Sequence, residues 1–256
     1  MSSDHKQTIL ELSSVIFRYG GSKPFIENLS FSVGDGEYIG LLGANGSGKS
    51  TLLRLASGIL KPTEGSITLW GKHLATYNNK DRAKLLSYLP QMLDVNVPFT
   101  VREIAAMGLY PYDIPPEMKI DDALEIVGLK EKAASSLATL SGGEKRRAFI
   151  AMTLLQGAGL LLLDEPLANL DIKYRIELQR LLKKLQETKN ISIIMALHDI
   201  NAAFHFEKVM LIKEGRILGI GRPEEVLTAA LLKEAFDVPV EIQKTASGGT
   251  YIRYEM

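Results

Sequence analysis

EYIGLLGANGSGKS, residues 37 to 50, is the stretch from which the fold of this chain follows. Glu37 to Gly43 has the apolar pattern of a strand and runs directly into a glycine-rich loop, and a helical pattern begins at Lys49. The segment from Gly43 to Ser50 fits the phosphate-binding pattern G-x-x-x-x-G-K-[ST] in the strand-to-helix context that this pattern requires. The alternative, a glycine-rich turn with a surface lysine, does not account for this context. We therefore expect a nucleotide-phosphate site.

The chemistry of this loop assigns a role to each part of it. Loop amides and a helix N-terminus together form a nest for an anion. Lys49 is expected to reach the β- and γ-phosphates, and the Ser50 hydroxyl is expected to bind Mg²⁺. The residues expected to contact the nucleotide here are Gly43, Asn45, Gly46, Ser47, Gly48, Lys49, Ser50 and Thr51.

A second candidate site follows the apolar run LLLLDE, Leu160 to Glu165. A buried parallel strand of this kind delivers the residues after it to the ligand edge of the sheet. Asp164 is suited to bind Mg²⁺, and Glu165 is suited to polarise an attacking water. The alternative is that both acids merely cap the segment that starts at Pro166.

The segment LSGGEKRR, Leu140 to Arg147, is more than a helix start. Ser141 and Glu144 have the spacing of a capping box. Two glycines in a first helical turn cost roughly 1 kcal/mol each relative to alanine. A sequence that needs only a cap has little reason to keep Gly142 and Gly143, so we expect something to approach the backbone there.

Composition and charge exclude several classes of protein. The 256 residues contain 30 Lys+Arg and 30 Asp+Glu, so no overall positive field draws the chain to nucleic acid or anionic lipid. The absence of cysteine excludes a disulfide, a cysteine-ligated metal and a thiol nucleophile. The start, MSSDHKQTILEL, lacks the pattern of a secretion signal, and the apolar runs are far shorter than the roughly 20 residues of a membrane helix. We expect a cytosolic chain that a partner brings to any membrane.

The distribution of patterns predicts an α/β fold in one domain, residues 1–256. Alternation of strand and helix predicts a mostly parallel sheet covered on both faces. An antiparallel β layer is expected near the N-terminus, and strand signals vanish between about residues 92 and 140, where we expect an inserted helical lobe. The core lobe then comprises about residues 1–91 and 141–256. The segments expected in the antiparallel layer are Thr8 to Phe17, Phe25 to Val33 and Gly65 to Leu69.

The order of these motifs resembles that of nucleotide-binding subunits of ABC transporters. GANGSGKS is followed by a lone Gln91 in SYLPQ, then by LSGGE, LLLLDE, ANLD ending at Asp171, and His198 in MALHD. Tyr19 in FRYG resembles the aromatic residue that stacks on adenine in this family. The resemblance covers nearly the whole chain and implies a P-loop ATPase that uses ATP and Mg²⁺.

The resemblance also implies that ATP lies between two such chains arranged head to tail, in a homodimer. It implies that Gln91 contacts Mg²⁺ or the attacking water and that His198 binds the γ-phosphate. By composition alone, Gln91 is a polar loop residue, His198 a structural histidine and Tyr19 a packing aromatic. The residues expected at the dimer site are Ser141, Gly142, Gly143, Glu144 and Asp171.

Two departures from the family pattern leave contacts at the dimer seam open. Many relatives have glutamine shortly after the signature, where this chain has Lys145 to Arg147, and serine-alanine where it has Ala168-Asn169. Neither departure removes an expected phosphate or metal ligand.

Softer features indicate the subfamily. SYLPQ, MGLYPY and GRPEEVLTAALLKEAFDVPVEI resemble ATPase subunits of bacterial importers for iron-siderophore, haem or cobalamin. Zinc or manganese importer ATPases and a soluble ATPase of iron-sulfur assembly are the alternatives, and a small-molecule kinase fits less well because of LSGGE. The importer interpretation implies permease subunits, an indirect substrate-binding protein, no nucleic acid, and a location at the cytoplasmic face of the inner membrane.

Overall fold

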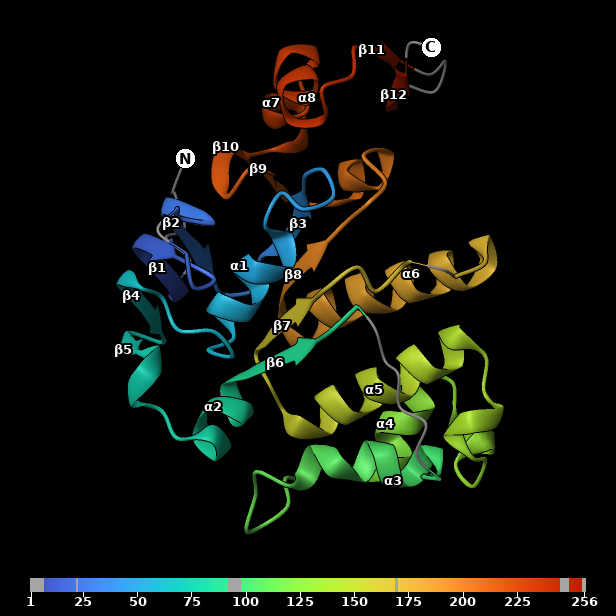
Figure 1. The fold of residues 1–256 in the computed structure, drawn as a ribbon. Coiled ribbons are helices and arrows are strands. Elements are labelled where there is room, and N and C mark those ends of the chain that lie inside the picture. Colours follow the sequence, from blue (N-terminus) through green and yellow to red (C-terminus); the bar gives the residue numbers. More distant parts are fainter. Residues whose placement is uncertain (1–6, 22, 92–97, 169, 245–248, 255–256) are drawn as a thin grey trace. The chain divides into compact units, whose positions relative to one another are not determined.

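The computed structural model describes residues 7–21, 23–91, 98–168, 170–244 and 249–254 (Figure 1). The chain divides into two compact units. The first unit contains residues 1–75 and 193–256, and the second unit contains residues 76–192. The predicted helical insert, about residues 92–140, falls within the second unit, and its own boundaries stay a prediction.

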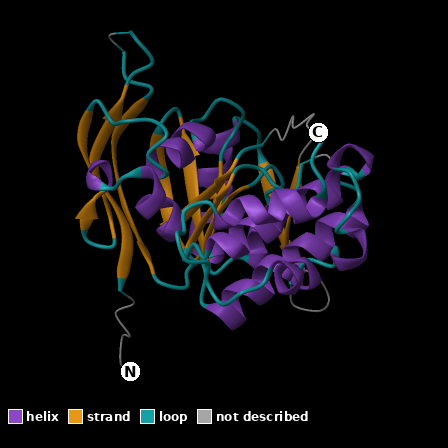
Figure 2. Cartoon of the chain, turned by 90° about the horizontal axis from the view of Figure 1, so that it is seen from below, coloured by secondary structure: helices purple, strands orange, loops and turns teal. Residues whose placement is uncertain are grey.

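The N-terminal strands of the first unit form an antiparallel sheet, as the sequence predicted. Strand β1 (Thr8–Phe17) pairs with β2 (Ile26–Gly34) and with β4 (Glu64–Leu69), and β4 also pairs with the short β5 (Lys72–His73). Figure 2 shows these strands as a layer of orange arrows. Buried and exposed side chains alternate along much of β2, as expected for a sheet with one face packed against the core.

Parallel strands form the second sheet of the first unit. Strand β3 (Tyr38–Leu42) is buried at every position and pairs in parallel with β8 (Ser192–Ala196) and β9 (Lys208–Lys213). Strand β10 (Arg216–Gly221) adds to β9 in the antiparallel direction. The mostly parallel sheet is therefore confirmed, although the sequence patterns did not predict β9 and β10.

Short elements complete the first unit. Helix α1 follows the glycine-rich loop, and β11 pairs with β12 in a hairpin near the end of the chain. The bounds are α1 (Lys49–Ala56), η1 (Leu74–Thr76, which spans the boundary between the units), η5 (Asn201–His205), α7 (Pro223–Val226), α8 (Ala229–Phe236), β11 (Val240–Lys244) and β12 (Thr250–Tyr254).

Two parallel strands organise the second unit. Strand β6 (Leu86–Leu89), which the sequence patterns did not predict, pairs with the predicted strand β7 (Leu160–Leu163). Their register aligns Leu89 with Leu163, so both strands end at the same edge. Gln91 follows one strand and Asp164 follows the other, which places polar side chains together at that edge.

The rest of the second unit is helical. Helix α5 packs against α3, η2 and α4. None of the helices in the described parts of the chain is long and apolar enough to cross a membrane. The bounds are α2 (Asn79–Leu85), α3 (Val101–Ala106), η2 (Met107–Leu109), α4 (Ile120–Ile126), η3 (Lys130–Lys132), η4 (Leu137–Thr139), α5 (Gly142–Gln156) and α6 (Ile172–Lys189).

Local signals in the sequence set the ends of two of these helices. Thr100 and Glu103 have the sequence spacing that predicts a capping box, and the structure confirms it at α3. Thr100 Oγ1 accepts from the Glu103 N–H at 3.2 Å, and Glu103 accepts from the Thr100 N–H at 2.7 Å. The pattern from Asp121 to Val127 predicts a helix with Gly128 as its C-cap, but helix α4 ends at Ile126 and Val127 is its C-cap. Gly128 then follows with φ of +68°, the left-handed conformation that glycine takes most readily just past a helix.

Candidate functional site

The glycine-rich loop of the first unit has the geometry of an anion nest. Helix α1 begins at Lys49, and its N-cap, Gly48, has φ of +111° and supplies no side-chain cap. Gly46 also has positive φ, at +78°. The first N–H groups of α1 therefore lack the side-chain acceptor that usually caps them, and they suit a negatively charged group.

Buried polar atoms in this loop fit the predicted phosphate ligand. Lys49 is only 5% exposed, and its Nζ donates to the carbonyl oxygens of Gly43 at 2.8 Å and Ala44 at 3.2 Å. The Oγ of Ser47 is buried and makes no hydrogen bond within the described residues. A buried ammonium and an unsatisfied hydroxyl beside a helix N-terminus match the charge and hydrogen-bonding capacity of a nucleotide phosphate.

The hairpin of β9 and β10 supports the loop from outside, a contact that sequence reasoning missed. The Gly215 N–H donates to the carbonyl of Ser47 at 2.8 Å, and the Glu27 N–H donates to the carbonyl of Gly215 at 3.1 Å. A Cβ on Gly215 would lie 1.9 Å from the carbonyl oxygen of Phe25, so only glycine fits. The glycine between two apolar runs was the signal that could have revealed this turn.

Tyr19 lies beside a cavity that reaches the loop. The cavity has a volume of about 800 Å³ and is lined in part by Tyr19, Phe25 and Gly46. The ring of Tyr19 meets Phe17 and Phe25 edge-on, with centroids 4.7 and 5.3 Å away, and it remains 55% exposed. Tyr19 is thus held by two aromatic neighbours and is still accessible to a ligand.

The other predicted residues of the first unit lie at its surface or along α1. His198 follows strand β8 and is exposed, as is Asn45 in the loop. Ser50 is half-buried, and Thr51 is buried with its hydroxyl against that of Tyr19.

In the second unit, the predicted catalytic residues meet at the ends of β6 and β7. Gln91 donates a hydrogen bond from Nε2 to the carboxylate of Glu165. Asp164 and Glu165 are 1% and 6% exposed, and the Tyr88 hydroxyl donates to Asp164 at 3.2 Å. Glu165 has φ of +47°, a costly conformation for a residue with a Cβ, which points to a functional constraint at the end of β7.

Arg146 and Tyr88 also reach this cluster, although sequence reasoning assigned neither a role. Arg146 is 7% exposed and donates from Nη2 to the carbonyl oxygen of Gln91 at 2.7 Å. A charged residue on a helix is usually solvated, so no sequence pattern indicated that Arg146 would be buried.

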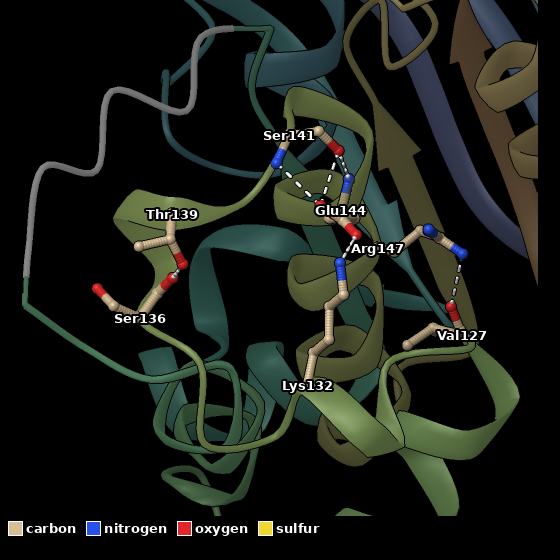
Figure 3. Close-up of polar contacts among 7 residues, drawn as sticks. All are labelled: Val127, Lys132, Ser136, Thr139, Ser141, Glu144 and Arg147. Atoms are coloured by element: carbon tan, nitrogen blue, oxygen red, sulfur yellow. Dashed lines mark hydrogen bonds and ion pairs between the residues drawn. The ribbon is translucent and has the colours of Figure 1, made fainter.

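The predicted capping box at α5 is confirmed and extends further than predicted. Glu144 accepts hydrogen bonds from the N–H and the Oγ of Ser141, each at 2.9 Å, and from Lys132 (Figure 3). These contacts lower the pKa of Glu144 to about 2, with the hydrogen bond from Lys132 as the largest cause and that from the Ser141 N–H as the second. Glu144 is thus held as an anion within its own unit, and its predicted contact with a nucleotide stays a prediction.

The two signature glycines differ in their surroundings. A Cβ on Gly143 would lie 3.2 Å from the Cβ of Tyr174, so packing within the second unit explains this glycine. Among the described residues, a Cβ on Gly142 would meet only Leu170, at 4.0 Å, so packing against this part of the chain does not explain Gly142. Asp171 is exposed at the start of α6 and makes no side-chain cap there.

The residues that depart from the family pattern differ in how they are held in the structure. Arg147 donates to the carbonyl of Val127 at 3.3 Å and so ties α5 to the end of α4 (Figure 3), whereas Lys145 is half-buried on the helix surface. Ala168 is half-buried, and Asn169 lies outside the described residues.

Comparison with known proteins decides the family. The ABC transporter family matches residues 26–168. The chain belongs to this family. It is 41% identical to the petrobactin import ATP-binding protein FpuC of Bacillus anthracis, over 88% of this chain and 86% of that protein. It is 37% identical to the hemin import ATP-binding protein HmuV of Rhodopseudomonas palustris (strain HaA2), over 97% of this chain and 98% of that protein.

A solved structure agrees with the fold. The dimeric, post-hydrolysis structure of the ATP-binding cassette MJ0796 with ADP and Pi superposes with a TM-score of 0.74 at 25% identity, covering 84% of this chain and 99% of that chain. The predicted family, fold class and ABC-type ATPase are thereby confirmed. The roles of individual site residues stay predictions.

Proposed function

We propose that this chain is the ATP-hydrolysing subunit of a bacterial ABC importer that takes up an iron chelate, haem or cobalamin. The names of the two relatives, which concern petrobactin and hemin import, support this class of cargo. The observation that carries the ATPase function is the buried Lys49 with the unsatisfied Ser47 hydroxyl in the phosphate loop. A zinc or manganese importer ATPase and a soluble ATPase of iron-sulfur assembly remain the alternatives.

The phosphate loop binds the triphosphate. Lys49 exchanges the carbonyls of Gly43 and Ala44 for the β- and γ-phosphates, and the Ser47 hydroxyl gains the acceptor it lacks. Tyr19 stacks on the adenine from the side of the cavity. The remaining contacts come from Gly43, Asn45, Gly46, Gly48, Ser50 and Thr51.

Mg²⁺ is held by Ser50, Gln91 and Asp164 in this proposal. A hydroxyl, an amide oxygen and a carboxylate are the hard oxygen ligands that Mg²⁺ prefers, so the residues fit this ion. The bound ion would neutralise charge on the β- and γ-phosphate oxygens. Tyr88 orients the Asp164 carboxylate through its 3.2 Å hydrogen bond.

Glu165 is the proposed general base that orients the attacking water. Its carboxylate is engaged by the Gln91 amide in the structure, so this amide must turn away before Glu165 accepts a proton from water. The same turn would free the Gln91 side chain to act as a ligand of Mg²⁺. His198, exposed after β8, binds the γ-phosphate.

Two copies of the chain form a head-to-tail homodimer around ATP, which completes both sites. The open space at Gly142 supports this part of the proposal, since a γ-phosphate from the partner can approach the main chain there. Ser141 and Gly143 supply the neighbouring hydroxyl and amide, and Asp171 contributes at the seam. Glu144 acts by holding Ser141 in place.

The dimer would work at the cytoplasmic face of the cell membrane, bound to integral-membrane permease subunits and served indirectly by a substrate-binding protein. Co-purification from detergent with a polytopic permease tests this arrangement. A chain that purifies only with soluble partners would favour the iron-sulfur assembly alternative.

Substitution of Lys49 tests the nucleotide site. Lys49→Ala removes the charge on the β- and γ-phosphates, so we expect triphosphate binding to weaken by roughly a hundredfold or more. Lys23→Ala is a suitable control, because Lys23 lines the same cavity outside the phosphate loop. A folded Lys49→Ala protein with unchanged ATP affinity would contradict the assignment of the loop.

A further inference from the structure

Arg146 is a buried cation to which the proposed function gives no role. It lies in α5, two residues beyond the capping glutamate Glu144, and its side chain reaches the carbonyl oxygen of Gln91, 55 residues away in sequence. Nη2 makes this contact at 2.7 Å, whereas Nη1 is buried and makes no hydrogen bond within the described residues. A buried guanidinium with an unsatisfied donor is unfavourable unless nearby charges compensate it.

Two carboxylates provide this compensation. Burial lowers the pKa of Arg146, and the charges of Asp164 and Glu165 act in the opposite direction. Both carboxylates are themselves almost fully buried, at 1% and 6% exposure. One arginine thus balances part of the charge of two adjacent acids.

The contacts form a continuous path from α5 to the proposed base. Arg146 holds the main-chain carbonyl of Gln91, and the side-chain amide of Gln91 holds the carboxylate of Glu165. The direction of a side chain depends on the orientation of its own backbone, so a fixed carbonyl at residue 91 limits where the amide points.

We propose that Arg146 is a positioning residue for ATP hydrolysis: it fixes the main chain at Gln91, so that the Gln91 side chain stays within reach of both Glu165 and the proposed Mg²⁺ site. This inference rests on the proposed role of Glu165 in hydrolysis. The other two basic residues of this segment lack the contact, since Arg147 binds Val127 and Lys145 lies on the helix surface. Arg146 is therefore the basic residue of this segment that reaches Gln91.

Kinetics of three variants test the proposal. Arg146→Gln removes the charge and shortens the side chain, so kcat should fall roughly tenfold while the Kd for a fluorescent ATP analogue changes less than about twofold. Arg146→Lys keeps a charged donor and should restore most of kcat. Lys145→Gln removes the same formal charge from the adjacent position and should keep the wild-type kcat.

A double-mutant cycle separates positioning from a merely structural effect. Gln91→Ala deletes the amide through which Arg146 acts, so adding Arg146→Gln to it should lower kcat by less than about twofold. If the fall in kcat of the double variant equals the product of the falls in the two single variants, the inference is overturned.

Hydrogen exchange gives a readout that needs neither nucleotide nor hydrolysis. Without nucleotide, the amides of residues 86–89 and 91 should exchange several-fold faster in Arg146→Gln than in wild type or Lys145→Gln. Unchanged exchange would also overturn the inference. If Arg146→Gln does not fold, hydrogen exchange and kinetics are measured on Arg146→Lys instead. An Arg146→Lys protein that keeps the wild-type kcat although these amides exchange several-fold faster would contradict the proposal. A folded wild-type protein with no ATPase activity would contradict the proposed function itself. The exchange experiment does not depend on ATPase activity, so the two failures can be told apart.

Discussion

The hydroxyl groups of Tyr19 and Thr51 lie 2.9 Å apart and share a hydrogen bond. Thr51 belongs to the first turn of α1, beside the proposed phosphate site, and Tyr19 belongs to the segment after β1. The proposed adenine platform is therefore tied to the helix whose N-terminus faces the phosphates. ATP would compete with Tyr19 for the Thr51 hydroxyl while it gains the ring as a stacking surface.

Substitutions at Tyr19 separate these two effects. Tyr19→Ala removes the stacking surface, so we expect the Kd for ATP to rise by roughly tenfold. Tyr19→Phe and Tyr19→Trp keep an aromatic face without the hydrogen bond to Thr51, so they should bind ATP as tightly as wild type or more tightly. Titration with a fluorescent ATP analogue measures all three. Equal weakening in Tyr19→Ala and Tyr19→Phe would assign the energy to the hydroxyl and remove the stacking role.

The contrast between Gly142 and Gly143 gives a matched pair of alanine substitutions. Gly143→Ala places a Cβ 3.2 Å from Tyr174, so we expect the free energy of unfolding to fall by about 1–3 kcal/mol. Gly142→Ala meets open space and should change it by less than about 1 kcal/mol. Thermal unfolding measures both effects.

The same pair tests the dimer contact through activity. Gly142→Ala should lower the ATPase rate despite its normal stability, because its methyl group blocks the approach of the partner's γ-phosphate. A Gly142→Ala protein with the stability and the ATPase rate of wild type would argue against close approach at this position.

The ion pair between Lys132 and Glu144 should make stability depend on pH. The pKa of Glu144 is lowered from 4.5 in an unfolded chain to about 2 in the folded protein. The depressed pKa means that the stabilisation is fully present above pH 4.5 and is lost as the pH falls toward 2. Since Lys132 is half-exposed, we expect Lys132→Met to lower the free energy of unfolding by only about 1 kcal/mol at pH 7.

Urea unfolding of wild type and Lys132→Met at several pH values measures this linkage. The difference between the two proteins should narrow below pH 4.5. Lys130→Met is the control, because Lys130 pairs with Glu125 at the surface and that pair should contribute little. A difference that stays constant down to low pH would mean that Lys132 stabilises the chain by packing.

Local patterns predicted the parts of this structure that depend on neighbouring residues. The strand, loop and helix from Glu37 onward, and the capping boxes at Thr100 and Ser141, follow from hydrophobic periodicity and side-chain hydrogen bonds within a few residues. The apolar run at β7 was predicted because burial on both faces leaves no polar position.

Long-range contacts were not predictable in the same way. The contact of Arg146 with Gln91 joins residues 55 positions apart, and the contact of Gly215 with Ser47 depends on how the hairpin of β9 and β10 meets the loop. No periodic pattern encodes either contact. Gly143 shows the difference. The sequence indicated that a glycine is needed in the first turn of α5, but only the structure shows that at position 143 the neighbouring Tyr174 side chain requires it.

Glu165→Gln tests the proposed base and the proposed dimer together. Glutamine keeps the size of the side chain and still accepts a hydrogen bond from Gln91, but it lacks the basicity of the carboxylate. We therefore expect ATP binding to survive while hydrolysis falls by about two orders of magnitude or more. The loss of a negative charge near the γ-phosphate also favours the closed dimer.

Light scattering with ATP and with ADP shows which assembly forms. Wild type with ADP should be mostly monomeric, whereas Glu165→Gln with millimolar ATP should accumulate as a dimer of twice the 28.2 kDa chain mass. Hydrolysis at the wild-type rate in Glu165→Gln would move the catalytic role elsewhere, with His198 the first residue to examine. An inactive variant that stays monomeric at high protein concentration would leave Glu165 as the base, but it would mean that closure of the dimer requires the permease.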